Sequence, residues 1–297
     1  MKPLKAHNII DIIAPAGKVH LPAVFDEIEQ ILQTWGYQAR FGKNILGNHS
    51  FLSHTLEKRF EDLVQALYAE DSNIIWCYRG GNGSSELLPL LDTLTPPSSS
   101  RIFLSFSDAT SLHIYFNQRW GWTTFHGPGA KQIVGDKIDN ISLNHIQQLF
   151  KNQLDSPLNY HLKAVNKISE KTAEISGIIT GGNLSIIAHS LGTPYQIQTD
   201  HKILLLEDVN EPAYKIRRML IHLSQANIFK NIKALILGEF INPDLLEKQW
   251  IEHELQEFAN LQSFPVFQTD KIGHGKTNYV VPLGSCVSLL NAHIICA

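Results

Sequence analysis

Ser107 lies where a short apolar segment is followed by a helical pattern, and this position suits a nucleophile. Residues 101–106 predict a buried strand and residues 108–116 predict a helix. A sharp turn between the two lifts a side chain clear of the sheet and directs free N–H groups towards whatever it attacks. The alternative is a serine that only caps the helix. The local sequence Ser-Phe-Ser-Asp lacks the Gly-x-Ser-x-Gly pattern, so both readings stay open.

Two residues in the second half of the chain have equally unusual settings. Glu207 follows the apolar run 203–206 directly, and a carboxylate at the end of a buried strand needs a partner because burying it alone is costly. An ordinary strand-end acid in a solvated turn explains this segment equally well. His274 lies between Gly273 and Gly275, which predicts a tightly shaped loop. Histidine titrates near pH ~6.5, as a general base requires.

The chain order serine, glutamate, histidine is that of one convergent class of catalytic triads. Ser107, Glu207 and His274 are far apart in the sequence, so they can meet only through folding. Together they predict a hydrolase that works through a serine nucleophile. Metal catalysis is a weaker reading, because the sequence has no His-Glu-x-x-His motif and no Cys/His cluster at ligand spacing. We expect neither a metal nor a cofactor.

A glycine-rich turn, residues 79–83, follows the short apolar strand predicted at 73–78. The carboxyl ends of parallel strands share one edge of a sheet, where ligands bind, so we expect this turn beside Ser107. Glycines let the backbone approach a substrate closely. A free N–H in the turn and that of Asp108 could form an oxyanion hole. A phosphate-binding turn is the alternative, but the sequence has neither Gly-x-Gly-x-x-Gly nor Gly-Lys-Ser/Thr here.

The elements that must position these residues fall into two parts. The first half alternates short apolar strands with amphipathic helices, which predicts an α/β fold with a parallel sheet covered on both faces. A more polar stretch separates it from a second half with several apolar strands and one clear helix. We therefore predict an N-terminal domain over residues 1–150, a linker over 151–170 and a smaller, β-rich C-terminal domain over 171–297.

Composition excludes some classes of protein. The 25 Lys and Arg residues nearly balance the 28 Asp and Glu residues, and no basic run stands out, so a nucleic-acid partner is not expected. No segment approaches the ~20 apolar residues of a membrane span, and the short N-terminal run 8–14 reads as a strand rather than a signal peptide. Three cysteines without a C-x-x-C motif favour a reducing compartment. We expect a soluble, cytoplasmic protein.

The chain resembles the LD-carboxypeptidases, also called muramoyltetrapeptide carboxypeptidases, of bacterial cell-wall recycling. Each shared motif is short, but many occur in the same order along nearly the whole chain. They lie at residues 14–17, 79–83, 106–113, 126–128, 181–185, 191–195, 206–209, 273–278 and 282–284. The resemblance implies a Rossmann-like N-terminal domain, a smaller β-rich C-terminal domain, a site between them and a homodimer.

The resemblance also implies the roles of the site residues. Ser107, Glu207 and His274 take the positions of the family's catalytic serine, glutamate and histidine. The oxyanion hole falls near Gly81 and on the amide of Asp108. The reaction implied is removal of the terminal D-alanine from murein tetrapeptide, by cleavage of an L–D amide bond.

Arg79 and Asn82, in the glycine-rich turn, are the candidates for binding the substrate. Arg79 is a candidate for binding the free carboxylate of the substrate, because its fork matches a carboxylate, with a structural salt bridge as the alternative. The sequence departs from the family pattern at Ser105, where glycine is usual, and at Asn82, where an aromatic residue is common. Asn82 is expected to border the substrate, and Ser105 could crowd the turn at Ser107.

Three other functions compete with this one. A microcin-immunity peptidase, which cleaves a peptidyl or aminoacyl nucleotide, is equally similar at the triad. An aromatic stacking residue near the site would favour it, and Asn82 argues mildly against it. A non-catalytic ligand-binding module would bind without turnover and would tolerate the substitution Ser107→Ala. A nucleotide-dependent oxidoreductase is least consistent with the sequence, since the dinucleotide fingerprint is missing.

Overall fold

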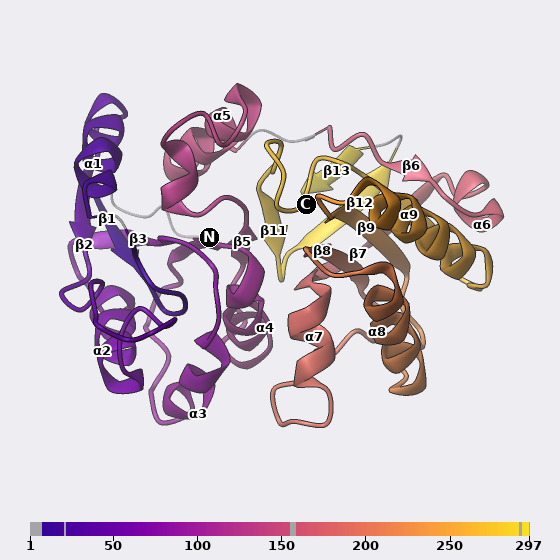
Figure 1. Ribbon diagram of the computed structural model, residues 1–297, viewed down its shortest axis with the longest axis horizontal. Helices are drawn as coiled ribbons and strands as arrows, with labels where there is room; N and C mark the ends of the chain where they lie inside the picture. The colour runs from indigo at the N-terminus through magenta and orange to yellow at the C-terminus, as the bar shows by residue number, and fades with distance from the viewer. Residues whose placement is uncertain (1–7, 21, 155–158, 291–292, 297) are drawn as a thin grey trace.

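The computed structural model describes residues 8–20, 22–154, 159–290 and 293–296. Within these residues the strands form a six-stranded and a seven-stranded sheet, each covered by helices. The two sheets and their helices form two lobes that lie side by side (Figure 1). The α/β fold class predicted from the sequence is confirmed, with a parallel sheet in the N-terminal lobe.

The sheet of the N-terminal lobe has the strand order β11-β5-β4-β3-β1-β2. Strands β1 to β5 run parallel to one another, and β11 is antiparallel to β5. The strands are β1 (Ile9–Ile13), β2 (Gln38–Phe41), β3 (Ser72–Cys77), β4 (Ile102–Ser105), β5 (Thr124–His126) and β11 (Val281–Leu283). The helices are α1 (Val24–Thr34), α2 (Leu56–Leu67), α3 (Leu88–Leu91), α4 (Thr110–Arg119) and α5 (Asn140–Phe150).

Alternate residues of the central strands fill two cores, one on each face of this sheet. Ile74 and Trp76 of β3 pack with residues of α1 and α5 on one face. Ile75 and Cys77 pack with residues of α2 and α4 on the other. Because both faces are covered, β3 is buried along its whole length.

The sheet of the C-terminal lobe has the order β13-β12-β7-β8-β9-β10-β6. Its parallel centre, β7 to β10, is flanked by antiparallel strands. The strands are β6 (Lys163–Ala164), β7 (Glu174–Asn183), β8 (Ile203–Val209), β9 (Ala234–Ile241), β10 (Val266–Gln268), β12 (Cys286–Leu290) and β13 (His293–Cys296). The helices are α6 (Lys167–Glu170), α7 (Leu184–Ser190), α8 (Ala213–Gln225) and α9 (Leu245–Asn260).

Sheet membership does not follow the predicted domain ranges everywhere. Strand β6 and helix α6 lie in the range 151–170, which was expected to be a linker, and β6 pairs with β10 in the second sheet. Strand β11 lies in the range 171–297 but pairs with β5 of the first sheet. The domain boundaries therefore stay a prediction, and residues 1–7 of the first range lie outside the described residues.

The two lobes are joined at the N-terminal end of α4. The backbone N–H of Asn183, at the end of β7, donates to Thr110 Oγ1 of α4 over 2.9 Å. A Cβ atom on Gly182 would lie only 2.6 Å from the same oxygen, so a side chain there would separate the lobes. This junction lies three residues after Ser107.

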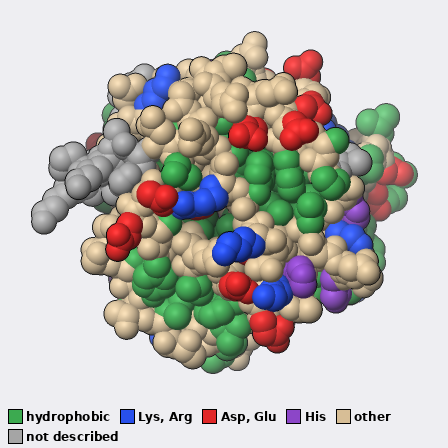
Figure 2. Space-filling view, turned by 90° about the vertical axis from the view of Figure 1, so that its left-hand side faces the viewer, with side chains coloured by type: hydrophobic (Ala, Val, Ile, Leu, Met, Phe, Trp, Pro, Cys, Tyr) green, Lys and Arg blue, Asp and Glu red, His purple; other side chains and the backbone are tan. Residues whose placement is uncertain are grey.

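The face of the N-terminal lobe in Figure 2 shows acidic and basic side chains interspersed among hydrophobic ones. This face therefore presents no extended field of a single sign, in agreement with the balanced composition. Among the helices of the described ranges, none combines the length and the apolar character needed to cross a membrane.

Candidate active site

Ser107 follows the end of β4 and opens a short 3₁₀ helix, Ser107–Ala109, that leads into α4. Its φ angle is +59°, a left-handed conformation that costs energy for a residue with a side chain. This backbone forms a sharp strand-to-helix turn, with the Ser107 side chain half-buried rather than enclosed. The predicted turn is confirmed.

The glycine-rich turn lies directly against Ser107, as expected from the parallel pairing of β3 with β4. A Cβ atom on Gly80 would lie 2.6 Å from Ser107 Cβ and 2.8 Å from its Oγ, so only glycine fits there without displacing the serine. Gly81 adopts φ +132°, and its N–H donates to no acceptor within the described chain. The free N–H of Gly81 therefore follows Gly80, the residue that packs against Ser107.

Arg59 of α2 holds this turn in place, and sequence reasoning missed it. Its guanidinium is buried and donates 2.8 Å hydrogen bonds to the carbonyl oxygens of Pro15 and Gly83. It also pairs with the carboxylate of Glu86. Arg59 interrupts an amphipathic helix in the sequence, where a charged residue usually indicates a solvated face, so no local signal identified it.

Asp108 is held by Ser84, at the end of the glycine turn. Its carboxylate accepts from the Ser84 N–H over 2.9 Å, and its carbonyl oxygen accepts from Ser84 Oγ over 2.6 Å. The amide of Asp108 belongs to the first turn of a helix, where N–H groups lack partners inside the helix. The two predicted oxyanion-hole amides, those of Gly81 and Asp108, thus come from two segments that are fastened to each other.

Glu207 lies in β8 at an irregularity of the sheet. The register between β8 and β9 shifts between Leu206 and Asp208, which is a bulge of the kind that redirects a side chain. Glu207 is completely buried and pairs in register with Asn183 of β7. Because Asn183 is bonded to Thr110, this carboxylate is brought close to the helix that begins at Ser107.

His274 and Glu207 form a close pair. His274 Nδ1 lies 2.6 Å from Glu207 Oε2, within the distance of a strong, charge-assisted hydrogen bond. The loop that carries His274 is shaped by Gly273 at φ +153° and by Gly275, where a Cβ would lie 2.2 Å from a carboxylate oxygen of Glu239. The glycine frame noted in the sequence therefore has a physical basis in close packing.

The ring of His274 lies beside the residue that precedes Ser107. Nε2 is buried and has no hydrogen-bond partner among the described residues. The ring packs against Phe106, which precedes Ser107, with 4.8 Å between the ring centroids. Catalytic hydrogen bonds are often open in proteins without substrate and close when it binds. The fold thus brings Glu207, His274 and the Ser107 turn together.

Burial and charge have opposite effects on the pKa values of Glu207 and His274. Burial raises the pKa of Glu207, but the charge of His274 and the contacts with His126 and His274 outweigh it and lower the pKa to about 2. Burial lowers the pKa of His274, but the Glu207 carboxylate outweighs it, so the pKa of His274 is raised above its ordinary value. The carboxylate is therefore charged at neutral pH and stabilises the protonated imidazole.

A third buried group touches the pair, and its role was also missed by sequence reasoning. His126, the last residue of β5, is completely buried, and its Nε2 lies 3.6 Å from Glu207 Oε1. The sequence offered His126-Gly127-Pro128 only as one of the motifs shared with a family. Among the described residues, no group of three or more His, Cys, Asp or Glu side chains is arranged to hold a metal ion.

The predicted substrate-binding residues lie around the same turn. Arg79 is half-buried, and its guanidinium donates to the carbonyl oxygen of Lys18 over 3.3 Å. It forms no ion pair with a carboxylate of the described chain, so the predicted alternative of a structural salt bridge is not seen. Asn82 is exposed and, with Asp108 and Tyr195, lines a cavity of about 530 Å³ between the lobes.

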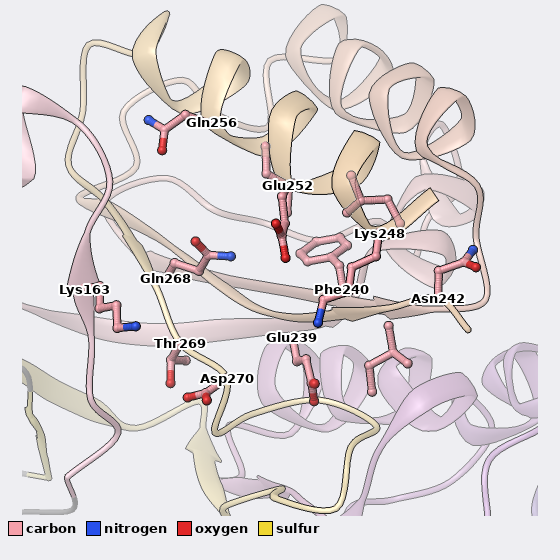
Figure 3. A pocket seen from close by; sticks show the side chains of 13 residues that line it. Lys163, Glu239, Phe240, Asn242, Lys248, Glu252, Gln256, Gln268, Thr269 and Asp270 are labelled. Carbon is pink, nitrogen blue, oxygen red and sulfur yellow. The ribbon is translucent and has the colours of Figure 1, made fainter. Parts of the chain in front are cut away.

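A second cavity, of about 410 Å³, lies in the C-terminal lobe beside the loop of His274. Figure 3 shows charged side chains of both signs around it, including Lys163, Lys248, Glu239 and Asp270. Glu239 also contacts the 273–275 loop, so this cavity lies behind the histidine rather than at Ser107. The cavity between the lobes is lined instead by Asp108, the residue that follows Ser107.

Known proteins resemble this chain over most of its length. Residues 10–127 match the family model of the LD-carboxypeptidase N-terminal domain, and residues 176–289 match that of its C-terminal domain. A putative carboxypeptidase of Rickettsia conorii is 36% identical over 78% of this chain and 72% of its own length. The murein tetrapeptide carboxypeptidase of Pseudomonas aeruginosa is 29% identical over 94% of this chain and 92% of its own length.

Solved structures show the same architecture. The muramoyltetrapeptide carboxypeptidase from Oxalobacter formigenes superimposes with a TM-score of 0.80 and 26% identity, over 96% of this chain and 97% of its own. The microcin C7 self immunity protein in complex with aspartyl sulfamoyl adenosine also has a TM-score of 0.80, but only 19% identity, over 99% and 97% of the chains. That second likeness concerns the fold alone. On the match of both domains, this chain belongs to the LD-carboxypeptidase family.

Proposed function

We propose that this protein is a serine carboxypeptidase that removes the terminal D-alanine from murein tetrapeptide by cleaving an L–D amide bond. Family membership and the murein peptide carboxypeptidases among its relatives support the substrate class. One observation carries the mechanism: the buried Glu207–His274 pair lies against the residue that precedes Ser107, and His274 keeps its other nitrogen free.

The first half of the reaction forms an acyl-enzyme. His274 Nε2 takes the proton of Ser107 Oγ as Oγ attacks the carbonyl carbon of the scissile amide. The negative charge that develops on the carbonyl oxygen is stabilised by the N–H groups of Gly81 and Asp108. Glu207 orients the imidazole and stabilises its charged form. His274 then gives the proton to the amide nitrogen, the C–N bond breaks, and D-alanine leaves.

The second half releases the shortened peptide. A water molecule loses a proton to His274 Nε2 and attacks the carbonyl carbon of the ester on Ser107. The C–Oγ bond breaks as the proton passes from His274 to Ser107 Oγ, and the enzyme returns to its starting form. No cofactor takes part in any of these steps.

Arg79 and Asn82 are the proposed substrate-binding residues. A carboxypeptidase must recognise a free terminal carboxylate, and the Arg79 guanidinium, beside the Gly81 turn, has no carboxylate partner among the described residues. Its fork can hold both carboxylate oxygens. Asn82 faces the cavity at Asp108 and can bond the peptide there.

The test is mass spectrometry of purified murein tetrapeptide after incubation with wild type, Ser107→Ala and Ser105→Ala. We expect loss of one alanine with wild type and with Ser105→Ala, but not with Ser107→Ala. Ser105 is a matched control, because its hydroxyl is buried two residues away and belongs to no step. Loss of alanine with Ser107→Ala would show that Ser107 is not the nucleophile. If none of the three proteins releases alanine, murein tetrapeptide is not the substrate.

An aminoacyl-nucleotide peptidase is the second candidate. The solved immunity protein that shares this fold is bound to aspartyl sulfamoyl adenosine. Tyr195 lines the cavity next to Asp108 and supplies the aromatic ring that such a ligand would need for stacking. Its hydroxyl is fixed by a 2.7 Å hydrogen bond to Asp92. Hydrolysis of an aminoacyl sulfamoyl adenosine, with the tetrapeptide left intact, would favour this function.

A ligand-binding module without catalysis is the remaining alternative. It predicts that tetrapeptide binds equally to wild type and Ser107→Ala and that neither protein releases alanine. The homodimer implied by the family resemblance also stays a prediction. Equilibrium sedimentation would test it independently of the reaction.

A further inference from the structure

His126 lies next to the oxygen of the Glu207 carboxylate that His274 does not contact. Its Nε2 lies 3.6 Å from Glu207 Oε1, while His274 Nδ1 lies 2.6 Å from Glu207 Oε2. Both side chains of the His126–Glu207 contact are completely buried. Glu207 Oε1 has no hydrogen-bond partner among the described residues, and a buried carboxylate oxygen needs a donor. His126 Nε2, 3.6 Å away, is placed to supply one.

The position of His126 follows from the sheet that carries the nucleophile. His126 pairs in register with Ser105 of β4, two residues before Ser107, and with Val281 of β11. The N–H of Gly127 donates to the Ser105 carbonyl oxygen over 2.9 Å, which fixes the end of the strand. His126 thus belongs to the lobe of Ser107 but reaches the carboxylate of the other lobe.

Of the two neutral tautomers of His126, one suits this environment better. Nδ1 is also buried and has no hydrogen-bond partner within the described chain. A proton on Nδ1 would leave a buried N–H without an acceptor and would direct the Nε2 lone pair at a carboxylate oxygen. With the proton on Nε2, the donor nitrogen lies next to Oε1, and only the acceptor Nδ1 stays unused.

We propose that His126 is a positioning residue for the reaction: its Nε2–H holds Glu207 Oε1, so that Oε2 stays aligned with His274 Nδ1. The proposal rests on the proposed function for its kinetic consequence. The 3.6 Å separation exceeds a good hydrogen bond, and small movements of the lobes as substrate binds can shorten it. His126 therefore couples the two lobes through the carboxylate that both share.

His113, Asp208 and Glu239 are other titratable groups near His126 and His274. His113 of α4, whose ring centroid is 6.4 Å from that of His126, is kept neutral, because burial lowers its pKa to about 3. It is fixed between the Ser105 carbonyl oxygen and Thr124 Oγ1. Asp208 and Glu239 face His274 and contribute after Glu207 to its raised pKa.

The test compares His126→Leu with His126→Gln, which places an amide N–H close to the position of Nε2. We expect the leucine variant to lower kcat for tetrapeptide about 10- to 100-fold with little change in KM, since a bond to a charged group is lost. The glutamine variant should recover much of this loss. His145→Leu is the matched control, a buried histidine that packs on Tyr279 instead.

A second readout needs no substrate: NMR titration of the His274 ring, assigned with His274→Gln. Without the His126 donor, Glu207 Oε2 is no longer held against His274 Nδ1, so the pKa of His274, which Glu207 raises, should fall in His126→Leu and return in His126→Gln. A purely structural role predicts lower stability without this shift. An unchanged His274 titration in a folded His126→Leu protein overturns the proposal, whereas absence of tetrapeptide cleavage by wild type overturns only the proposed function.

Discussion

The nucleophile turn and the Glu207–His274 pair hold their reactive groups by different means. Ser107 is fixed by its backbone, with a left-handed φ of +59° and the glycine turn packed directly against its side chain. Glu207 and His274 are fixed by side-chain contacts, with one short hydrogen bond and opposing effects of burial and charge on their pKa values. The Ser107 turn is therefore sensitive to added volume, and the Glu207–His274 pair is sensitive to a change of charge.

This difference predicts how each region fails. A substitution that adds volume beside Ser107 should displace the nucleophile even when every polar contact is kept. A substitution that keeps the shape of Glu207 but removes its charge should leave the structure in place and change both rate and titration. Single substitutions at Glu207 and at Gly80 distinguish these two kinds of failure.

Glu207→Gln should have the largest effect. We expect kcat to fall about 10⁴-fold, as when the acid of a catalytic triad is replaced by an amide. The carboxylate raises the pKa of His274, so its removal should lower that pKa and move the acid limb of the kcat/KM profile to lower pH.

Glu239→Gln is the matched control for this charge. Glu239 raises the pKa of His274 less than Glu207 does and makes no hydrogen bond to the ring. We expect a small shift of the acid limb in the same direction and a kcat close to that of wild type. A Glu207→Gln enzyme with nearly full activity would contradict the assigned triad.

Gly80→Ala should have the next largest effect. The added methyl group would lie 2.6 Å from Ser107 Cβ, and displacing the serine should lower kcat about 10²- to 10³-fold. Gly177→Ala is the control, because its Cβ would approach closely only the flexible Lys233 side chain, at 3.0 Å, and would lie at ordinary contact distance, 3.6 Å, from His201 and Ile203. Full activity of Gly80→Ala, measured on tetrapeptide, would show that the turn does not constrain the nucleophile.

Ser105→Ala should have the smallest effect. Ser105 Oγ is buried without a hydrogen-bond partner in the described chain, and its polar neighbour is the weakly interacting Cys77 thiol. Removing this hydroxyl should leave stability unchanged or raise it by up to about 1 kcal/mol. Ser72→Ala is the contrast, because Ser72 Oγ donates to the carbonyl oxygen of Ile9 over 3.0 Å and its loss should destabilise. Thermal unfolding of the two variants measures this difference.

The sequence predicted the parts of the site that carry local patterns. Apolar runs marked β4 and β8, and Ser107 follows the first as expected, whereas Glu207, expected at the end of its strand, lies inside β8, which continues to Val209. The glycines around His274 marked a tightly packed loop, and the glycine turn was expected beside Ser107 because parallel strands share an edge. Each of these inferences rests on a few consecutive residues.

What the sequence could not predict depends on contacts between distant segments. Strand β11 lies far from β5 in the chain, yet completes the sheet of the other lobe. The bulge at Glu207 arises from the register of two strands and leaves no trace in the apolar run itself. His126 and Arg59 act through partners on other elements, and a single buried histidine or arginine in a sequence does not show which partner it has.

The measurement that tests the account most directly is covalent labelling with a fluorophosphonate, which reacts with activated serines, followed by peptide mass spectrometry. The account predicts a single phosphonylated residue, Ser107, in wild type. Labelling should be at least about 10²-fold slower in Glu207→Gln, since the serine is activated through His274. Labelling of another residue, or equal rates in both proteins, would contradict the claim that the two lobes join at one Ser–His–Glu centre.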